Sequence, residues 1–198
     1  MISITRITEW DDKWICKINR INFPGVVSVI FQIFTHISSN IIWFPTLSII
    51  YFFFFPENIF LRFLLTCMVV DLFIELPSKF LFKRLRPYAS PSIKGKIVER
   101  EFMKSKANTS FPSGHAMLTM QYFFSILLFA PVSAGFIFVG IMMIIVLFIG
   151  FSRIYLGVHF PTDVFFGYIF GMGIVGITLM IFPFSTEIIK FLFFLAKI

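Results

Sequence analysis

The chain has 198 residues, of which 58% are hydrophobic and 14% charged, and its formal net charge is +7. A soluble domain averages roughly 45–50% apolar and about 25% charged residues. The composition therefore argues against a soluble domain and predicts an integral membrane protein, while the length allows one domain.

The N-terminal segment predicts an amphipathic helix and no secretory signal peptide. Residues 1–13 contain no apolar run followed by a small-residue cleavage site. Over residues 6–21, apolar residues recur at helical spacing and charged residues occupy the opposite face. This pattern is typical of a helix that lies in the membrane interface, with its tryptophans at the headgroups. The apolar face comprises Ile7, Trp10, Trp14, Ile18 and Ile21, and the charged face Arg6, Asp11, Asp12, Lys13, Lys17 and Arg20.

Six apolar stretches follow this helix. Residues 24–37 are short for a crossing, which needs about 20 apolar residues, and they predict a short or half-inserted helix. The other five predict full spans, which must be helical because lipid offers no partner for loose backbone groups. These spans cover residues 40–56, 58–82, 113–131, 134–152 and 161–183, with prolines at or near several of their ends.

The predicted fold is therefore an all-α polytopic transmembrane helix bundle of five to six spans with an N-terminal amphipathic interfacial helix. We expect residues 1–40 to form interfacial amphipathic and short hydrophobic helices, and residues 41–198 to form the membrane-embedded core. Gly167 and Gly171 make a GxxxG pattern in the last span, which predicts close helix packing.

The whole net charge lies in one loop. Residues 79–106 carry nine basic and two acidic residues, and the charges of the remaining chain cancel. This loop is interpreted either as a topology signal or anionic-lipid patch, or as a funnel for a phosphorylated substrate. Nucleic-acid binding is the weakest alternative, because membrane spans flank the loop.

Ionisable residues inside apolar helices are costly, so each is a functional candidate. Asp71, Glu75 and Lys79 are spaced four apart and share one helix face. Asp71 and Glu75 are interpreted as structural groups that neutralise a neighbouring charge inside the bundle. Arg86 follows Lys79 by seven residues, and the proline after it is expected to end the helix there. Lys79 and Arg86 would then point into one site at the membrane surface, suited to phosphate oxygens.

Residues 112–115 read PSGH at the start of the next span. Pro112 is expected in the first turn of that helix, where its missing N–H costs nothing. Ser113 and Gly114 would contribute free backbone N–H groups at the positive end of the helix dipole, which is a ready anion site. His115 would lie in the same turn, next to the anion.

Residues 152–163 read SRIYLGVHFPTD. Arg153 ends one span, and His159 follows six residues later at the expected start of another helix. Asp163 lies four residues beyond His159, where a carboxylate can accept from one imidazole nitrogen and leave the other nucleophilic.

The order of the spans predicts that residues 79–87, 112–115 and 152–163 meet on one face of the membrane. Two histidines, two arginines, one lysine and one aspartate converge there, beside two helix N-termini, and the residues form no plausible metal site. Three residues outside this cluster are interpreted as structural or interfacial: Cys16, Cys67 and His36.

These stretches resemble the three-part signature of the type-2 phosphatidic acid phosphatase superfamily, which includes lipid phosphate phosphatases and soluble haloperoxidases. The predicted spans favour the bacterial membrane-bound branch over the haloperoxidases. The parts are Lys79-x6-Arg86-Pro87, Pro112-Ser113-Gly114-His115 and Ser152-Arg153-x5-His159-x3-Asp163, in the order and spacing of the family.

The resemblance implies a mechanism. His159 would attack phosphorus and form a phosphohistidine, Asp163 would orient His159, and His115 would protonate the leaving oxygen and then help to activate water. The resemblance implies no metal and no other cofactor. The phosphate ligands would be Lys79, Arg86, Ser113, Gly114 and Arg153.

The first hypothesis is therefore a membrane phosphatase that hydrolyses a lipid phosphomonoester or diphosphate. Candidate substrates are undecaprenyl diphosphate, phosphatidate, phosphatidylglycerophosphate and a lipid A phosphate. The alternatives are a lipid phosphotransferase that uses the same phosphohistidine, and a non-catalytic membrane scaffold or transporter. The expected partners are the lipid substrate and membrane lipids, without nucleic acid, and no oligomeric state is indicated.

The face of the membrane that holds the site is a point of conflict. The positive-inside rule places the basic loop in the cytoplasm, whereas the resemblance implies the outer face of the cytoplasmic (inner) membrane. We follow the resemblance, because substrate binding is a reason for several of these charges. The expectation is a multi-pass protein with its site on the periplasmic face and its C-terminus in the cytoplasm.

Overall fold

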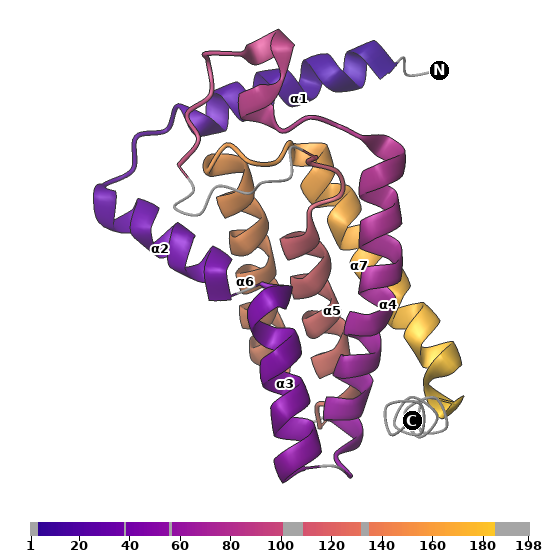
Figure 1. Cartoon of the computed structure of the whole chain (residues 1–198). Helices are drawn as coiled ribbons and strands as arrows, with labels where there is room; N and C mark the ends of the chain where they lie inside the picture. Colours follow the sequence, from indigo (N-terminus) through magenta and orange to yellow (C-terminus); the bar gives the residue numbers. More distant parts are fainter. Residues whose placement is uncertain (1–3, 38, 56, 101–108, 132–134, 185–198) are drawn as a thin grey trace.

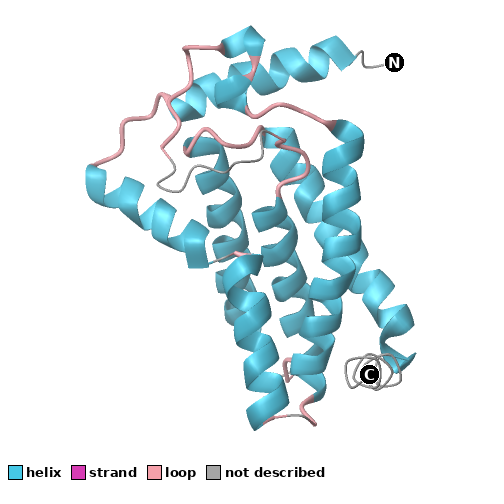
Figure 2. Cartoon of the chain, viewed as in Figure 1, coloured by secondary structure: helices cyan, strands magenta, loops and turns pink. Residues whose placement is uncertain are grey.

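The computed structural model describes residues 4–37, 39–55, 57–100, 109–131 and 135–184. Within these ranges the chain forms seven α-helices and a few 3-10 turns, joined by loops, with no β-strand (Figure 2). The prediction of an all-α fold is confirmed. The helices are α1 (Ile4–Asn19), α2 (Gly25–Ile37), α3 (Asn40–Phe54), α4 (Ile59–Phe82), α5 (Gly114–Phe129), α6 (Gly135–Tyr155) and α7 (Pro161–Ile181).

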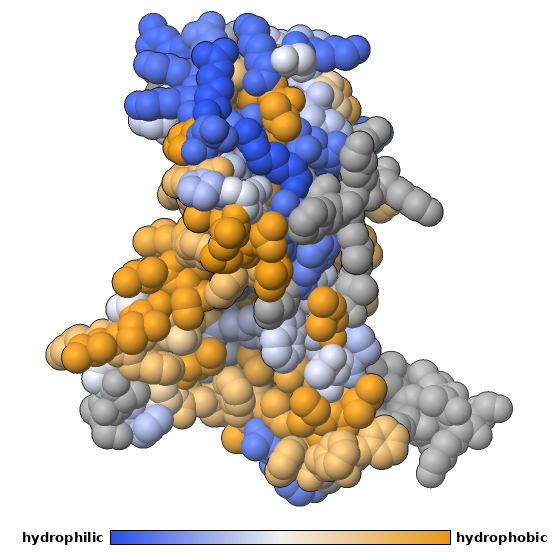
Figure 3. All heavy atoms as spheres, turned by 90° about the vertical axis from the view of Figure 1, so that its left-hand side faces the viewer, coloured by the Kyte–Doolittle hydropathy of each residue, from blue (hydrophilic) through white to orange (hydrophobic). Residues whose placement is uncertain are grey.

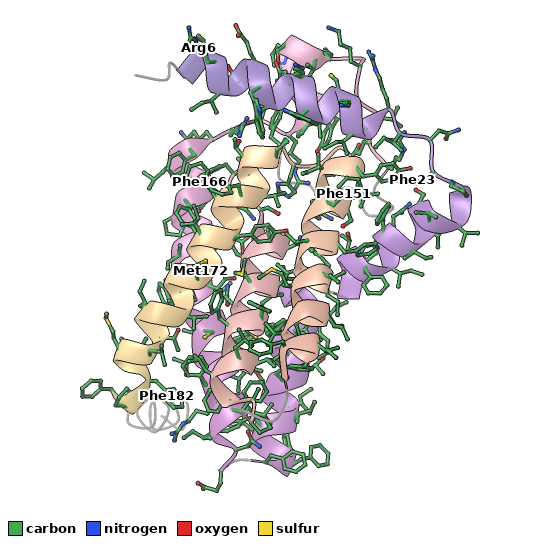
Figure 4. The ribbon with its side chains drawn as sticks, turned by 180° about the vertical axis from the view of Figure 1, so that it is seen from behind. Arg6, Phe23, Phe151, Phe166, Met172 and Phe182 are labelled. Atoms are coloured by element: carbon green, nitrogen blue, oxygen red, sulfur yellow. The ribbon has the colours of Figure 1, made fainter. Side chains whose placement is uncertain are left out.

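The helices form a bundle with a cover at one end. α3 to α7 lie side by side along the bundle, and α2 leans against α6 (Figure 1). α1 lies across the end where α4 and α6 finish and α5 and α7 begin, next to the 3-10 turn at Pro91–Ile93. Seen from behind, Phe166 marks the α1 end of α7 and Phe182 lies beyond its opposite end (Figure 4).

Within the part of the chain that the structure describes, two helices are long and apolar enough to cross a membrane: α6, and α7 extended to Phe184. α4 has 24 residues but carries four ionisable side chains, while α3 and α5 have only 15 and 16 residues. Residues 24–37 form one short helix, α2, as predicted. Among the described residues, the structure thus identifies two of the expected five to six spans by length and composition.

The surface of the bundle is that of a membrane protein. Phe73, Phe80 and Leu81 of α4 and Phe136 and Ile137 of α6 are each at least 73% exposed. Figure 3 shows hydrophilic residues gathered at the α1 end of the molecule and hydrophobic residues over much of the rest of that face. Exposed apolar side chains on this scale are unfavourable in water and suit contact with lipid.

α1 turns a different face to the bundle from the one its apolar pattern predicts. Asp11, Ile15 and Asn19 are spaced four apart, are at most 1% exposed and pack against the bundle, whereas Ile7 and Trp10 are 43% and 49% exposed. The expectation that all the charged residues of α1 face water is therefore wrong for Asp11. A location of α1 in the membrane interface stays a prediction, as does the division of the chain at residue 40.

α5 and α7 make the closest contact in the bundle. A Cβ on Gly167 would lie 2.8 Å from the carbonyl oxygen of Ser113, and one on Gly171 would lie 2.5 Å from the carbonyl oxygen of Met117. Only glycine allows this approach, because the atoms that would be met belong to backbone and cannot move aside. The GxxxG pattern therefore packs α7 onto α5, as predicted.

Replacement of Gly171 by alanine is expected to loosen this contact. The added methyl group must push the α5 backbone away, which typically costs about 1–3 kcal/mol. We expect Gly171→Ala to lower the thermal unfolding midpoint in detergent. Gly173→Ala is the matched control, because nothing lies within 4 Å of a Cβ there. Equal midpoints for the two variants would contradict this account of the packing.

Candidate active site

The first stretch of the site begins on α4 and continues beyond its end. α4 ends at Phe82, and Lys83 caps it in the left-handed conformation, with φ of 44° and its N–H donating to the carbonyl of Lys79 at 3.3 Å. The expectation that this helix runs to Arg86 is therefore wrong. Arg86 comes after the turn and is 6% exposed, so the left-handed residue, rather than helical spacing, directs it inward.

The two carboxylates of α4 have separate partners. Lys79 forms an ion pair with Glu75, four residues before it, as the spacing predicts. Asp71 is fully buried and accepts a hydrogen bond of 2.9 Å from the side-chain amide of Gln121 on α5.

The segment after α4 pairs with the segment before α5. Leu85 and Thr109 form an isolated antiparallel bridge, and the Ser110 N–H donates to the carbonyl of Arg84 at 2.8 Å. Ser110 is fully buried, and its own carbonyl lies 2.7 Å from Nδ1 of His159. A carbonyl can only accept, so Nδ1 carries the proton in this hydrogen bond, and Nε2 keeps its lone pair.

The PSGH motif surrounds the N-terminus of α5. The helix begins at Gly114 with Ser113 as its N-cap, so the expected place of Pro112 in the first turn is wrong. The Ser113 N–H donates to the carbonyl of Asp163 at 3.0 Å. The expectation that this N–H is free is therefore wrong. The N–H groups of Gly114 and His115 lie in the first turn, where a helix offers no internal acceptor. They remain suited to bind an anion.

The side chain of Ser113 is the second sign of a ligand at this helix end. Its hydroxyl does not cap α5, is fully buried and has no hydrogen-bond partner within the described ranges. Buried hydroxyl groups without a partner are rare and costly. A phosphate oxygen at the N-terminus of α5 would supply one.

His159 is brought back over Arg153 by a glycine turn. Gly157 follows the end of α6 with φ of 79°, a left-handed conformation that suits glycine at a helix C-terminus. The N–H groups of Val158 and His159 then both donate to the carbonyl of Arg153 at 3.3 Å. His159 precedes α7 rather than opening it, since that helix starts at Pro161. Arg153 and His159 are each 2% exposed.

Asp163 is close to His159 but does not hydrogen-bond to it. Its Oδ2 accepts from the N–H of Phe160 at 2.8 Å and lies 3.8 Å from Nδ1 of His159. Its Oδ1 accepts from Arg84 at 2.7 Å. The expected hydrogen bond from the imidazole is therefore made to Ser110, while the fully buried Asp163 carboxylate lies near the ring without bonding to it.

The structure brings all three stretches together at the α1 end of the bundle. Arg153, Arg86 and Lys79 lie close enough to both His159 and His115 to act on them electrostatically. Burial lowers the pKa of His159 well below its ordinary value of 6.5, and the three cations lower it further, while the Ser110 carbonyl opposes them. His159 is therefore neutral at pH 7.

Four contributors to the site could not be singled out from the sequence. Ser110 acts through its carbonyl, which every residue has. Arg84 lies in a basic run whose members look alike, and Asp11 adjoins Asp12 on a helix rich in charges. Thr162 donates its N–H to Oδ1 of Asp11 at 3.1 Å. The one sequence feature that could have indicated a role for Arg84 was its position two residues before Arg86.

Two further features bear on ligands. No three His, Cys, Asp or Glu side chains among the described residues are grouped so that they could hold a metal ion.

An apolar groove of about 220 Å³ lies between α2, α3, α5 and α6, and its lining includes Phe34, Thr119 and Ile149. Thr119 is one helical turn from His115, and Ile149 is one turn from Arg153, so the groove begins just below the polar cluster.

The sequence profile of the PAP2 superfamily matches residues 60–187, which is more than half of the chain and includes every signature residue. The chain belongs to the PAP2 superfamily. The resemblance seen in the three motifs is thereby confirmed.

Individual PAP2 proteins are similar to this chain. It is 29% identical over 105 residues to "Putative undecaprenyl-diphosphatase YbjG" of Escherichia coli (strain K12). That match covers 53% of this chain and 48% of the relative, so the similarity spans about half the length of that protein.

Two solved structures share the fold. LpxE of Aquifex aeolicus has a TM-score of 0.67 at 24% identity, over 85% of this chain and 93% of that one. The first transmembrane PAP2 type phosphatidylglycerolphosphate phosphatase from Bacillus subtilis has a TM-score of 0.64 at 24% identity, over 93% of this chain and 89% of that one. The chain therefore shares its helix-bundle fold with these two proteins.

The lowered pKa of His159 predicts a specific titration. Burial and nearby cations disfavour the imidazolium, so His159 should take up a proton only well below pH 6.5. NMR of the protein labelled at its histidine nitrogens checks this, with His159→Gln to assign the signal. A midpoint at or above 6.5 would show that the ring is neither buried nor surrounded by cations in solution.

Proposed function

We propose that this PAP2 protein removes a phosphate group from a membrane lipid by hydrolysis, through a phosphohistidine on His159. One observation carries the proposal: two histidines and three cations surround the N-terminus of α5, where the buried Ser113 hydroxyl has no partner among the described residues. A phosphate group matches this arrangement in charge and in hydrogen-bonding capacity.

The phosphate ligands would divide their roles by position. Arg86 and Arg153 are buried and offer planar sets of donors for phosphate oxygens, while Lys79 is 26% exposed and adds a point charge. Ser113 and the N–H of Gly114 would add hydrogen bonds. Each such donor stabilises developing charge by on the order of 3–4 kcal/mol. Because cations supply this stabilisation, we propose that no metal ion is needed.

In the first step, Nε2 of His159 attacks phosphorus, and the bond from phosphorus to the lipid oxygen breaks. The Ser110 carbonyl holds the proton on Nδ1, so that the lone pair of Nε2 is available. The ring gains positive charge in this step, which the nearby carboxylate of Asp163 stabilises. The negative charge of the bound phosphate favours the protonated form of His115, which gives this proton to the leaving lipid oxygen.

In the second step, water attacks the phosphohistidine. His115, which lost its proton in the first step, takes one from the water as the bond from phosphorus to Nε2 breaks. Inorganic phosphate leaves, and both histidines return to their starting states. A lipid hydroxyl in place of water would give the alternative, a lipid phosphotransferase with the same intermediate.

The site lies where a lipid phosphate would be presented. It occupies one end of an apolar bundle, and the groove below it lies beside Thr119 and Ile149, one turn from His115 and Arg153. This placement suits a lipid with its phosphate among the cations and a hydrocarbon chain along the groove. The name of YbjG supports undecaprenyl diphosphate as a candidate; phosphatidate, phosphatidylglycerophosphate and lipid A phosphate remain in the same class.

The test is a panel of these lipid phosphates with purified protein in detergent. We expect phosphate release from at least one lipid in the presence of a chelator, a loss of about a thousandfold or more in His159→Gln, and weaker activity on short-chain analogues. Mass spectrometry of the lipid products separates hydrolysis from transfer. The absence of release from every lipid, or release that His159→Gln leaves unchanged, would refute the proposal.

We further propose that the protein resides in the cytoplasmic (inner) membrane, with the site on its periplasmic face. The cations of the site have a role in binding phosphate, so their number need not report topology. A reporter fused to the C-terminus should then be active in the cytoplasm, because α7 runs from the site toward the opposite end (Figure 4). Reporter activity in the periplasm would reverse the orientation.

A further inference from the structure

A network of three charged side chains links α1 to the back of His159. Arg84 donates to Oδ2 of Asp11 at 2.6 Å and to Oδ1 of Asp163 at 2.7 Å, so its guanidinium joins the two carboxylates. Thr162 is the fourth member, since it accepts from Arg84 at 2.7 Å and its hydroxyl donates to Asp11. The network thus connects helix α1 with the start of α7.

The network is buried where a charge is costly. Asp11 and Asp163 are both fully buried, and the Arg84 side chain is 24% exposed and lies over the ring of Phe160 at 4.1 Å. Loss of one partner from such a group leaves a buried charge without compensation. Two carboxylates and one guanidinium leave a net charge of −1, which favours the positive ring that forms when His159 is phosphorylated.

Arg84 supports both groups that face Nδ1 of His159. Its backbone carbonyl accepts the N–H of Ser110, whose own carbonyl bonds the ring. Its side chain holds Asp163, whose other oxygen lies 3.8 Å from the same nitrogen. Arg84 therefore supports the nearby carboxylate through its guanidinium and the hydrogen bond to the ring through its backbone, and Asp11 is the second carboxylate that the guanidinium binds.

We propose that Asp11 is a positioning residue of the active site: it holds Arg84 in place, so that Asp163 and Ser110 fix the ring of His159. This inference rests on the proposed function and adds to it that α1 is part of the catalytic unit, although α1 lies outside the residues matched to the superfamily.

Docking of α1 and positioning by Asp11 are separable. The other end of α1 is held by Asn19, whose amide donates to the carbonyls of Val98 and Tyr155 and accepts from the N–H of Val98, each at 2.9 Å. Ile15 is fully buried between these two anchors. Because Asn19 and Ile15 remain, α1 should stay docked when Asp11 loses its charge.

The experiment measures Asp11→Asn, Arg84→Gln and the double variant in steady-state hydrolysis of the best lipid phosphate. Asparagine keeps the shape of Asp11 but places an amide against the donors of Arg84. We expect kcat to fall about tenfold or more, as for other supporting partners of catalytic groups, with KM changed by less than about twofold because the phosphate ligands are intact. Asp12→Asn is the matched control on the next residue of the helix.

The same variants also test whether Asp11 acts through Arg84 and whether α1 stays docked on the bundle. If Asp11 acts through Arg84, the double variant should be no slower than Arg84→Gln alone. Fluorescence quenching of Trp10 and Trp14, which flank Asp11 on α1, should match that of the wild type. The proposal would be overturned if Asp11→Asn kept a kcat within about twofold of the wild type. It would also be overturned if the fold-losses in kcat of the two single variants multiplied in the double variant, or if the loss of kcat came with greater tryptophan quenching.

A measurement without turnover separates this inference from the proposed function. The ring position is a property of the resting protein, so Asp11→Asn should shift the nitrogen NMR signals of His159, while Asp12→Asn should not. Unchanged signals would overturn the role of Asp11 even if the protein hydrolyses lipids. A shift in a protein that releases no phosphate from any lipid would instead leave Asp11 as a positioning residue and refute the proposed reaction.

Discussion

The close approach of α5 and α7 is the constraint on which the site depends. Gly167 and Gly171 let the two backbones meet, and the Ser113 N–H then reaches the carbonyl of Asp163 at 3.0 Å. This contact sets the PSGH motif beside the start of α7, so that two histidines 44 positions apart in the chain face one space. A larger side chain at either glycine would push the α5 backbone away and separate the two halves of the site.

The polar end of the bundle is organised as two neighbouring sets of buried charge. Arg86, Arg153 and Lys79, the last paired with Glu75, leave the space in front of the histidines positive by two charges, which suits a phosphate group. Behind His159, Asp11 and Asp163 outweigh Arg84 by one negative charge. Burial strengthens both effects, because interactions between charges are less screened away from water. The ring of His159 lies between the two sets, which is the arrangement that the proposed attack on phosphate requires.

Backbone turns place the side chains of the site as much as the helices do. The left-handed conformation of Lys83 ends α4 before Arg86, and that of Gly157 returns the chain so that His159 lies against the carbonyl of Arg153. Each turn places a functional residue just beyond a helix end. Side chains there can face inward without the cost of a charge in the middle of an apolar helix.

The sequence by itself determined the helical architecture and the family, and it predicted the residues that we propose for the site. Apolar runs in a chain that must satisfy its backbone in lipid leave only helices, and the three motifs carry their chemistry in the identity and spacing of residues such as His115 and His159. The GxxxG pattern predicted the contact of α7 with α5, because glycines four residues apart on a helix allow another helix to pack closely.

Only the tertiary structure decided how these residues are held. The apolar span 58–82 matched α4, but Pro87 suggested a helix end near Arg86, because nothing local marks Lys83 as a left-handed residue. The spacing of four assigned Asp163 to the imidazole, because spacing does not show that a backbone carbonyl competes for the same proton. Asp11 and Asp12 are identical in type and adjacent, yet Asp11 is fully buried against Arg84 and Asp12 is not. Which of two equal charges is buried depends on groups more than 70 positions away, and no local pattern contains that information.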